Sequence, residues 1–123
     1  MASLLVVDDD ADVLDVLCTV LRSGGHDVEG AASGLAALTL IERQPIDLLL
    51  TDVVMRGLNG FNLARMAVLR RPSIKVLYYS GFSEFTIGQD DGPKFGKLLH
   101  KPLHPDELRR QVAQALAAPP TQH

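Results

Sequence analysis

Five polar residues end or follow short apolar runs of the sequence. Their side chains together could bind a cation and a negatively charged group. Asp8 and Asp9 follow the first run, Asp52 ends a run that contains three leucines, and Ser80 and Lys101 follow two later runs. Three carboxylates that meet would repel one another unless a divalent cation supplies positive charge, and Mg2+ suits a site made of oxygen ligands. The ammonium and the hydroxyl would then be donors to a dianionic group on Asp52, which is what phosphoryl transfer needs.

These side chains can meet only if the strands that carry them lie side by side. The hydrophobic pattern predicts five strands, at residues 4–7, 26–30, 46–52, 74–79 and 95–100. Apolar residues at helical spacing, with cap and stop signals, predict helices at about residues 13–21, 33–41, 59–70, 83–87 and 105–116. The three consecutive leucines before Asp52 favour a strand that is covered on both faces.

Alternation of strands and helices indicates right-handed crossovers and a parallel sheet with helices on both faces. We therefore expect an α/β fold, a flavodoxin-like doubly wound (βα)5 sandwich whose five-stranded parallel sheet has the order 2-1-3-4-5. One domain would cover residues 1–118, and residues 119–123 would form a C-terminal tail. The first and third strands are neighbours in this order, so Asp8, Asp9 and Asp52 would converge at the ligand crevice.

Composition excludes several classes of function. The 123 residues include 12 Lys and Arg against 15 Asp and Glu, a formal charge of −3, so we expect no direct nucleic acid binding. No apolar run approaches the roughly 18 residues of a membrane span, and no leader-like segment opens the sequence, so we expect a cytoplasmic protein without a membrane partner. The single cysteine, Cys18, lies among apolar residues of a predicted helix and is expected to be buried and inert.

The order of these motifs is similar to that of response regulator receiver domains of the chemotaxis type (CheY-like) over essentially the whole chain. Asp8 and Asp9 resemble the acidic pair of that family, Asp52 its phosphoacceptor, Ser80 its Ser/Thr switch position, and Lys101 with the following proline its Lys-Pro pair. Each motif is common by itself, but the four in this order are specific. Residues 79–84 are also similar to receivers of hybrid histidine kinases.

The resemblance implies a role in two-component signal transduction. A histidine kinase or a phosphotransfer protein would donate a phosphoryl group to Asp52 in a reaction that needs Mg2+. The metal would be bound by Asp9, Asp52 and the backbone carbonyl of Val54, and Asp8 would act mainly through a metal-bound water.

The remaining implications concern output. Ser80 would move toward the phosphoryl oxygens and Lys101 would pair with another of them, and this movement would change the binding of a downstream protein that the resemblance does not specify. The peptide bond before Pro102 would be cis, which would direct the ammonium into the crevice. The chain would not be an enzyme beyond catalysing its own phosphorylation and slow dephosphorylation.

Several positions depart from the family pattern. Arg56 stands where the family usually has proline, and Leu98 replaces the aromatic residue of the family's switch. Together with the glycines after Ile87, this indicates that a partner reads a different face or an order–disorder change. Val54 and Phe82 occupy positions that influence loss of the phosphoryl group; neither can orient a water molecule, which predicts slow dephosphorylation.

Two other functions fit parts of the pattern. A phosphate-independent pseudo-receiver that binds proteins is suggested by Arg56 and Leu98. An aspartyl phosphatase would need the pattern Asp-x-Asp-x-Thr/Val after the first strand, which the aspartates at 8, 10 and 12 do not complete. The same aspartates imitate the start of a calcium loop, but Val13 and Thr19 stand where that loop needs glycine and glutamate.

Overall fold

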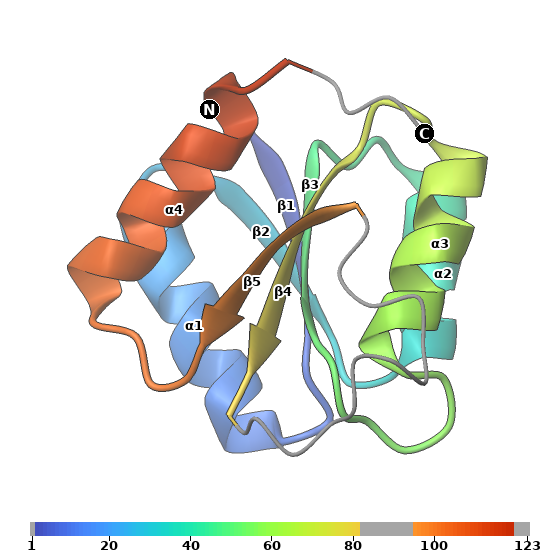
Figure 1. Cartoon of the computed structure of the whole chain (residues 1–123), viewed down its shortest axis with the longest axis horizontal. Helices are drawn as coiled ribbons and strands as arrows, with labels where there is room; N and C mark the ends of the chain where they lie inside the picture. The colour runs from blue at the N-terminus through green and yellow to red at the C-terminus, as the bar shows by residue number, and fades with distance from the viewer. Residues whose placement is uncertain (1, 82–94, 120–123) are drawn as a thin grey trace.

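The computed structural model describes residues 2–81 and 95–119, and these form a parallel sheet flanked by helices (Figure 1). In chain order the elements are β1 (Ser3–Val7), α1 (Ala11–Ser23), β2 (Asp27–Ala31), α2 (Gly34–Arg43), β3 (Leu48–Asp52), α3 (Gly60–Arg70), β4 (Lys75–Ser80), β5 (Gly96–His100) and α4 (Pro105–Ala117). The five predicted strands and four of the predicted helices appear within the described residues, with ends that differ from the prediction by at most two residues. The helix expected at residues 83–87 lies outside the described residues, as do Gly88 and Gly92, which follow it.

The sheet has the order β2-β1-β3-β4-β5, and every pair of neighbours is parallel. This confirms the predicted flavodoxin-like topology and the order 2-1-3-4-5. All strands therefore end at one edge of the sheet, and the helices begin at that edge because each connection returns the chain across a face. Polar residues that follow different strands meet there.

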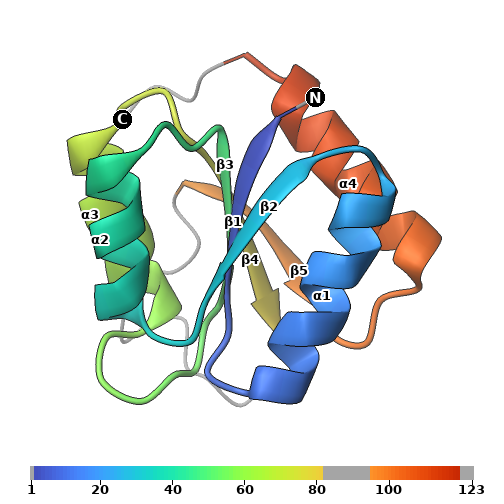
Figure 2. The same ribbon diagram turned by 180° about the vertical axis from the view of Figure 1, so that it is seen from behind.

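Two hydrophobic cores lie on opposite faces of the sheet. In Figures 1 and 2, α1 and α4 cover one face and α2 and α3 cover the other. Alternate residues of a strand point to opposite faces, so Leu5 and Leu49 pack toward α2 and α3 while Leu4, Leu48 and Leu50 pack toward α1 and α4. All five residues of β3 are buried, which confirms the prediction of a strand covered on both faces.

Local signals fix where the helices begin and end. The side chains of Asp10, Ser33 and Asn59 accept backbone hydrogen bonds from the first turns of α1, α2 and α3, and His104 does so for α4. Gly25, with φ of 89°, supplies the left-handed turn after α1. As a result, α1 begins directly after the acidic residues that follow β1.

Candidate functional site

The carboxyl ends of β1 and β3 bring the predicted acidic residues together. Val7 is in register with Thr51, so the residues that follow them, Asp8 and Asp52, lie at the same level of the sheet. One carboxylate oxygen each from Asp8, Asp9 and Asp52 can be chosen so that all three lie within 4.8 Å of one another. Both Asp8 and Asp52 are buried, with 1% and 8% of their surface exposed.

Backbone amides hold two of these carboxylates in place. The amide of Asp10 donates to Asp8 Oδ1 at 2.9 Å, and the amide of Val53 donates to Asp52 Oδ1 at 2.9 Å. Both donors belong to the segments that leave the strands, so the turn after each strand also orients its aspartate. The acidic cluster is therefore preorganised by local structure.

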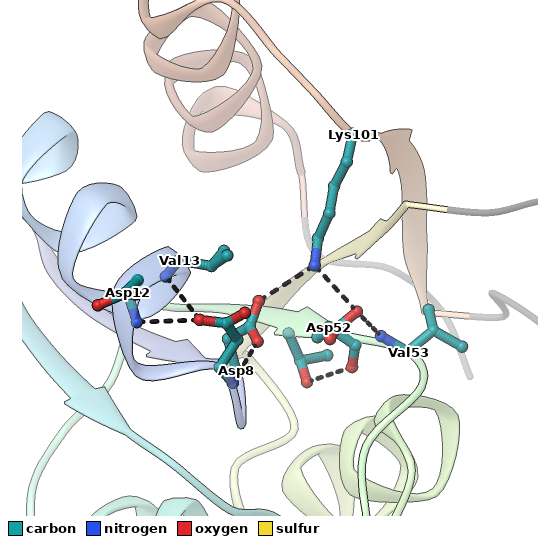
Figure 3. Close-up of polar contacts among 8 residues, drawn as sticks. Asp8, Asp12, Val13, Asp52, Val53 and Lys101 are labelled. Carbon is teal, nitrogen blue, oxygen red and sulfur yellow. Dashed lines mark hydrogen bonds and ion pairs between the residues drawn. The ribbon is translucent and has the colours of Figure 1, made fainter.

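Lys101 extends into this cluster from the end of β5, as Figure 3 shows. Its Nζ lies 3.2 Å from Asp8 Oδ2 and 3.5 Å from Asp52 Oδ1. Its backbone amide donates to the carbonyl of Ser80 at 2.8 Å, which ties the start of the loop to the end of β4. The Lys101–Pro102 peptide bond is cis, as the resemblance implies. One ammonium thus bridges two buried carboxylates.

The charges of the cluster shift its protonation equilibria. Burial, and after it the neighbouring Asp8, raise the pKa of Asp52 above its ordinary value, although Lys101 and the Val53 amide oppose this. Burial by itself would lower the pKa of Lys101, but the carboxylates of Asp52 and Asp8 together raise it. One ammonium does not fully compensate the acidic residues, so the cluster attracts further positive charge.

The donor chemistry of the cluster fits a magnesium ion. Mg2+ takes oxygen ligands at about 2.0 to 2.1 Å, so oxygens on opposite sides of the ion are roughly 4 Å apart. Adjacent octahedral ligands are roughly 3 Å apart, so the three carboxylate oxygens, which lie within 4.8 Å of one another, would draw closer by up to roughly 2 Å around the ion. Asp9 and Asp52 would hold the ion directly, and Asp8 lies close enough to act on it through a bound water.

Ser80 and Val54 lie at the same edge of the sheet. Ser80 is the last residue of β4 and is buried, and its neighbour across the sheet is His100, directly before Lys101. Val54 lies in the loop after β3, and 59% of its surface is exposed. Phe82, which the sequence pairs with it, lies outside the described residues, and Leu98 is a half-buried residue of β5 that packs on the core under α2 and α3.

Arg56 contacts the acidic cluster through Asp9. The sequence places this cation near the site but does not indicate its partner. Its backbone amide donates to Asp9 Oδ2 at 3.1 Å, and its Nε lies 3.6 Å from the same oxygen. The arginine side chain is 91% exposed, so solvent screens this ion pair. Because 47 residues separate the two in sequence, only the paired strand ends bring them together.

Tyr79 is a second contact that the sequence did not indicate. Lys101 Nζ lies 5.1 Å from the centroid of the Tyr79 ring. The sequence signal for this contact is an aromatic residue directly before Ser80, the last residue of β4. Because side chains alternate along a strand, Tyr79 and Ser80 point to opposite faces of the sheet. The site therefore has an aromatic surface on the face that α1 and α4 cover.

Gly60 sets how closely α3 approaches the site. A Cβ atom on this residue would lie 2.1 Å from the carbonyl oxygen of Asp52 and 2.9 Å from Val53 Cα. The Gly60 amide donates to the Val53 carbonyl at 2.9 Å, closing the loop that contains Val54. Glycine is required here because the first turn of α3 rests against the backbone of β3.

Comparison with known proteins shows the family to which the chain belongs. The family model of the response regulator receiver domain matches residues 4–113. The response regulator receiver protein CpdR of Brucella abortus is 33% identical over 119 residues, which cover 96% of this chain and 99% of that protein. No helix within residues 2–81 and 95–119 is long and apolar enough to cross a membrane.

Solved structures agree as well. The receiver domain of the hybrid histidine kinase CckA is 31% identical, with a TM-score of 0.79 over 93% of this chain and 98% of that one. A putative response regulator from Chloroflexus aurantiacus is 32% identical, with a TM-score of 0.82 over 95% and 98% of the two chains. The chain belongs to the family of response regulator receiver domains of two-component systems.

Proposed function

We propose that this receiver accepts a phosphoryl group on Asp52 in a Mg2+-dependent reaction and that phosphorylation changes its binding to a partner protein. The observation that carries the proposal is the Lys101 ammonium, which reaches both Asp8 and Asp52 at the edge where three carboxylate oxygens converge. This arrangement combines an acceptor carboxylate, a cation site and a fixed positive charge. A receiver over residues 1–118 with a short tail is consistent with the end of α4 at Ala117.

Each residue of the site has a distinct role in this proposal. A carboxylate oxygen of Asp52 forms a bond to phosphorus as the bond between phosphorus and the donor's histidine nitrogen breaks. Asp9, Asp52 and the Val54 carbonyl would hold Mg2+, and Asp8 would act mainly through a metal-bound water. The ion would supply the positive charge that lets an anionic carboxylate approach an anionic phosphoryl group. Lys101 pairs with one phosphoryl oxygen.

Ser80 links this chemistry to output. Its hydroxyl would donate to another phosphoryl oxygen, and β4 would transmit the movement to the adjoining surface. The donor is a histidine kinase or a phosphotransfer protein, a proposal supported by the similarity to the CckA receiver, whose description names a hybrid histidine kinase. The downstream target is a protein that distinguishes the two states of this surface.

Intact-mass measurement after incubation with acetyl phosphate and Mg2+ tests the phosphoacceptor. We expect a gain of one phosphoryl group that disappears in the Asp52→Asn variant and when EDTA removes the metal. Asp27→Asn is the matched control, because Asp27 is exposed at the start of β2, at the opposite edge of the sheet. Absence of any mass gain, or an unchanged gain in Asp52→Asn, would refute the proposal.

We also propose that phosphorylated Asp52 loses its phosphoryl group slowly. The support is Val54, an exposed apolar side chain in the loop after β3 that cannot orient an attacking water molecule. Replacing Val54 with asparagine should accelerate loss several-fold in a time course of intact mass. Loss within seconds in the wild-type protein, with no change in the variant, would contradict this idea.

One observation favours a second candidate, a phosphate-independent pseudo-receiver. Arg56 places a guanidinium beside Asp9, where it partly supplies the charge that a metal would otherwise bring. A protein that works in this way would bind its partner equally with and without acetyl phosphate and Mg2+. The mass experiment separates the two candidates, because a pseudo-receiver gains no phosphoryl group.

A further inference from the structure

Tyr79 lies beneath the site, on the face of the sheet that α1 and α4 cover. It is the penultimate residue of β4 and is in register with Asp52 on β3 and with Leu99 on β5. Only 6% of its surface is exposed, and it belongs to the same core as Leu50 and Leu99. The ring is therefore held by packing between the strand that carries the acceptor and the strand that carries the lysine.

Two parts of the Tyr79 side chain contact the segment after β5. The ring lies 5.1 Å from Lys101 Nζ, which is within the range in which an aromatic face attracts a cation. The hydroxyl lies near the backbone amide of Leu103, two residues further along, and both residues line the same cavity. Burial raises the pKa of Tyr79, so the phenol is neutral at physiological pH.

Packing alone does not fix the lysine. A cavity of about 360 Å3 opens beside it, lined by Tyr79, Leu17 and Leu103 among others. On another side, the aliphatic part of the Lys101 side chain passes Gly81. A Cβ atom added to Gly81 would still lie 3.4 Å from Lys101 Cδ, so glycine leaves space beside the lysine. A four-carbon stem with free space beside it samples several rotamers unless its ammonium has fixed partners.

The carboxylates are conditional partners of this ammonium. Asp8 and Asp52 attract Lys101 while they are uncompensated, but a divalent cation bound by the same carboxylates takes up much of their charge. The quadrupole of the Tyr79 ring does not depend on that charge. The ring is therefore the partner that remains when the site is loaded with metal.

We propose that Tyr79 is a positioning residue for Lys101: its ring keeps the ammonium above the acidic cluster in the metal-loaded protein, ready to pair with a phosphoryl oxygen. This inference rests on the proposed function, since it assigns Tyr79 a part in phosphorylation of Asp52. The ring, and not the hydroxyl, is the part of Tyr79 that lies against the ammonium of Lys101. The substitution of the ring, rather than of the hydroxyl, should therefore affect the reaction.

Tyr79→Leu removes the ring, and Tyr79→Phe removes only the hydroxyl. At saturating Mg2+, we expect Tyr79→Leu to slow phosphorylation by acetyl phosphate at least about five-fold and Tyr79→Phe to restore most of the rate. Calorimetry should show that Tyr79→Leu binds Mg2+ as tightly as the wild type or more tightly, because a displaced ammonium repels the ion less. A purely structural role would weaken metal binding and phosphorylation together.

Tyr78→Leu is the matched control. Tyr78 is the preceding residue of β4, is fully buried on the opposite face and packs edge-on against Phe61 at a centroid distance of 5.3 Å. Its substitution removes the same groups and lowers stability, but it leaves Lys101 in place, so the rate per folded molecule should match the wild type. Equal slowing in Tyr78→Leu and Tyr79→Leu, or a wild-type rate in Tyr79→Leu, would overturn the proposal.

A direct measurement separates this inference from the proposed function. In NMR spectra of the Mg2+-loaded protein we expect nuclear Overhauser effects between the Lys101 side chain and the Tyr79 ring, and these should persist in Tyr79→Phe. If the wild-type protein gains no phosphoryl group, the proposed function fails, and with it the part assigned to Tyr79 in phosphorylation. Absence of the Overhauser effects in a protein that is phosphorylated overturns the positioning of Lys101 alone.

Discussion

Replacing Gly60 with alanine is the sharpest structural test of how the fold shapes the site. The new methyl group would lie 2.1 Å from the Asp52 carbonyl oxygen, whereas ordinary contact begins at 3.4 Å, so the first turn of α3 must retreat by roughly the difference of 1.3 Å. The obstructing atoms belong to the backbone of β3 and cannot rotate away. The hydrogen bond from the Gly60 amide to the Val53 carbonyl would break, and Val54 would move with the loop.

Two opposing effects set the size of the stability change. Overpacking against a rigid neighbour costs about 1 to 3 kcal/mol. Alanine in place of glycine in a helix returns about 0.5 to 1 kcal/mol, and less at the first helical position. The steric cost dominates, so we expect a net loss of about 2 kcal/mol in the free energy of unfolding.

The same displacement should weaken metal binding. Mg2+ requires ligand distances close to 2.1 Å. If the Val54 carbonyl is a ligand as proposed, moving it by more than 1 Å removes it from the ion, and we expect affinity to fall about ten-fold. Urea unfolding followed by circular dichroism measures the first effect, and calorimetric titration with Mg2+ measures the second.

Gly25→Ala is the control for this experiment. Gly25 has a positive φ, nothing lies within 4 Å of the place that an added Cβ atom would take, and it follows α1 at the other edge of the sheet. It should lose about 1 kcal/mol of stability through backbone strain and keep its Mg2+ affinity. A Gly60→Ala protein that is as stable as the wild type, or that binds Mg2+ within two-fold of it, would refute the reasoning.

Three further substitutions test the electrostatics of the site. Burial and Asp8 raise the pKa of Asp52, so ionising this carboxyl lowers the free energy of unfolding. Asp52→Asn should therefore be more stable than the metal-free wild type in urea unfolding at pH 7. This difference in stability should shrink as the pH falls toward 3.8, the ordinary pKa of an aspartate. Lys101→Met leaves the buried carboxylate of Asp8 without its ammonium and should lose roughly 1 to 3 kcal/mol, with Mg2+ restoring more stability than it adds to the wild type. Arg56→Ala removes a cation beside Asp9 and should tighten Mg2+ binding roughly two- to five-fold at low salt, and less at high salt, by calorimetry.

Each of these has a contradicting outcome. A stability difference for Asp52→Asn that grows on acidification would mean that the folded state does not raise the pKa of Asp52. If Lys101→Met has the same free energy of unfolding as the wild type, the attraction between Lys101 and Asp8 only offsets the free-energy cost of burying these charges. Arg70→Ala is the control for Arg56→Ala, because Arg70 pairs with Glu42 at the other edge of the sheet; an equal gain in Mg2+ affinity would reveal only an effect of net charge.

Much of the architecture could be predicted because its determinants are local. The apolar runs, the N-caps at Ser33 and Asn59, and the glycine turn after α1 each fix a nearby element, and alternation of elements then restricts the topology. Element ends were less accurate: the third strand begins at Leu48 rather than residue 46, although Ile46 is buried. Burial of an apolar side chain does not require that its backbone joins the sheet.

The sequence by itself determined the identity and order of the groups at the site, because polar residues that end parallel strands must share one edge of the sheet. Only the tertiary structure decided which side chains and backbone groups are in contact at the site. The ion pair of Arg56 with Asp9, the ring of Tyr79 beside Lys101 and the close approach of Gly60 to β3 depend on strand register and on the path of loops. Those distances arise between segments that are far apart in the chain, and no local pattern encodes them.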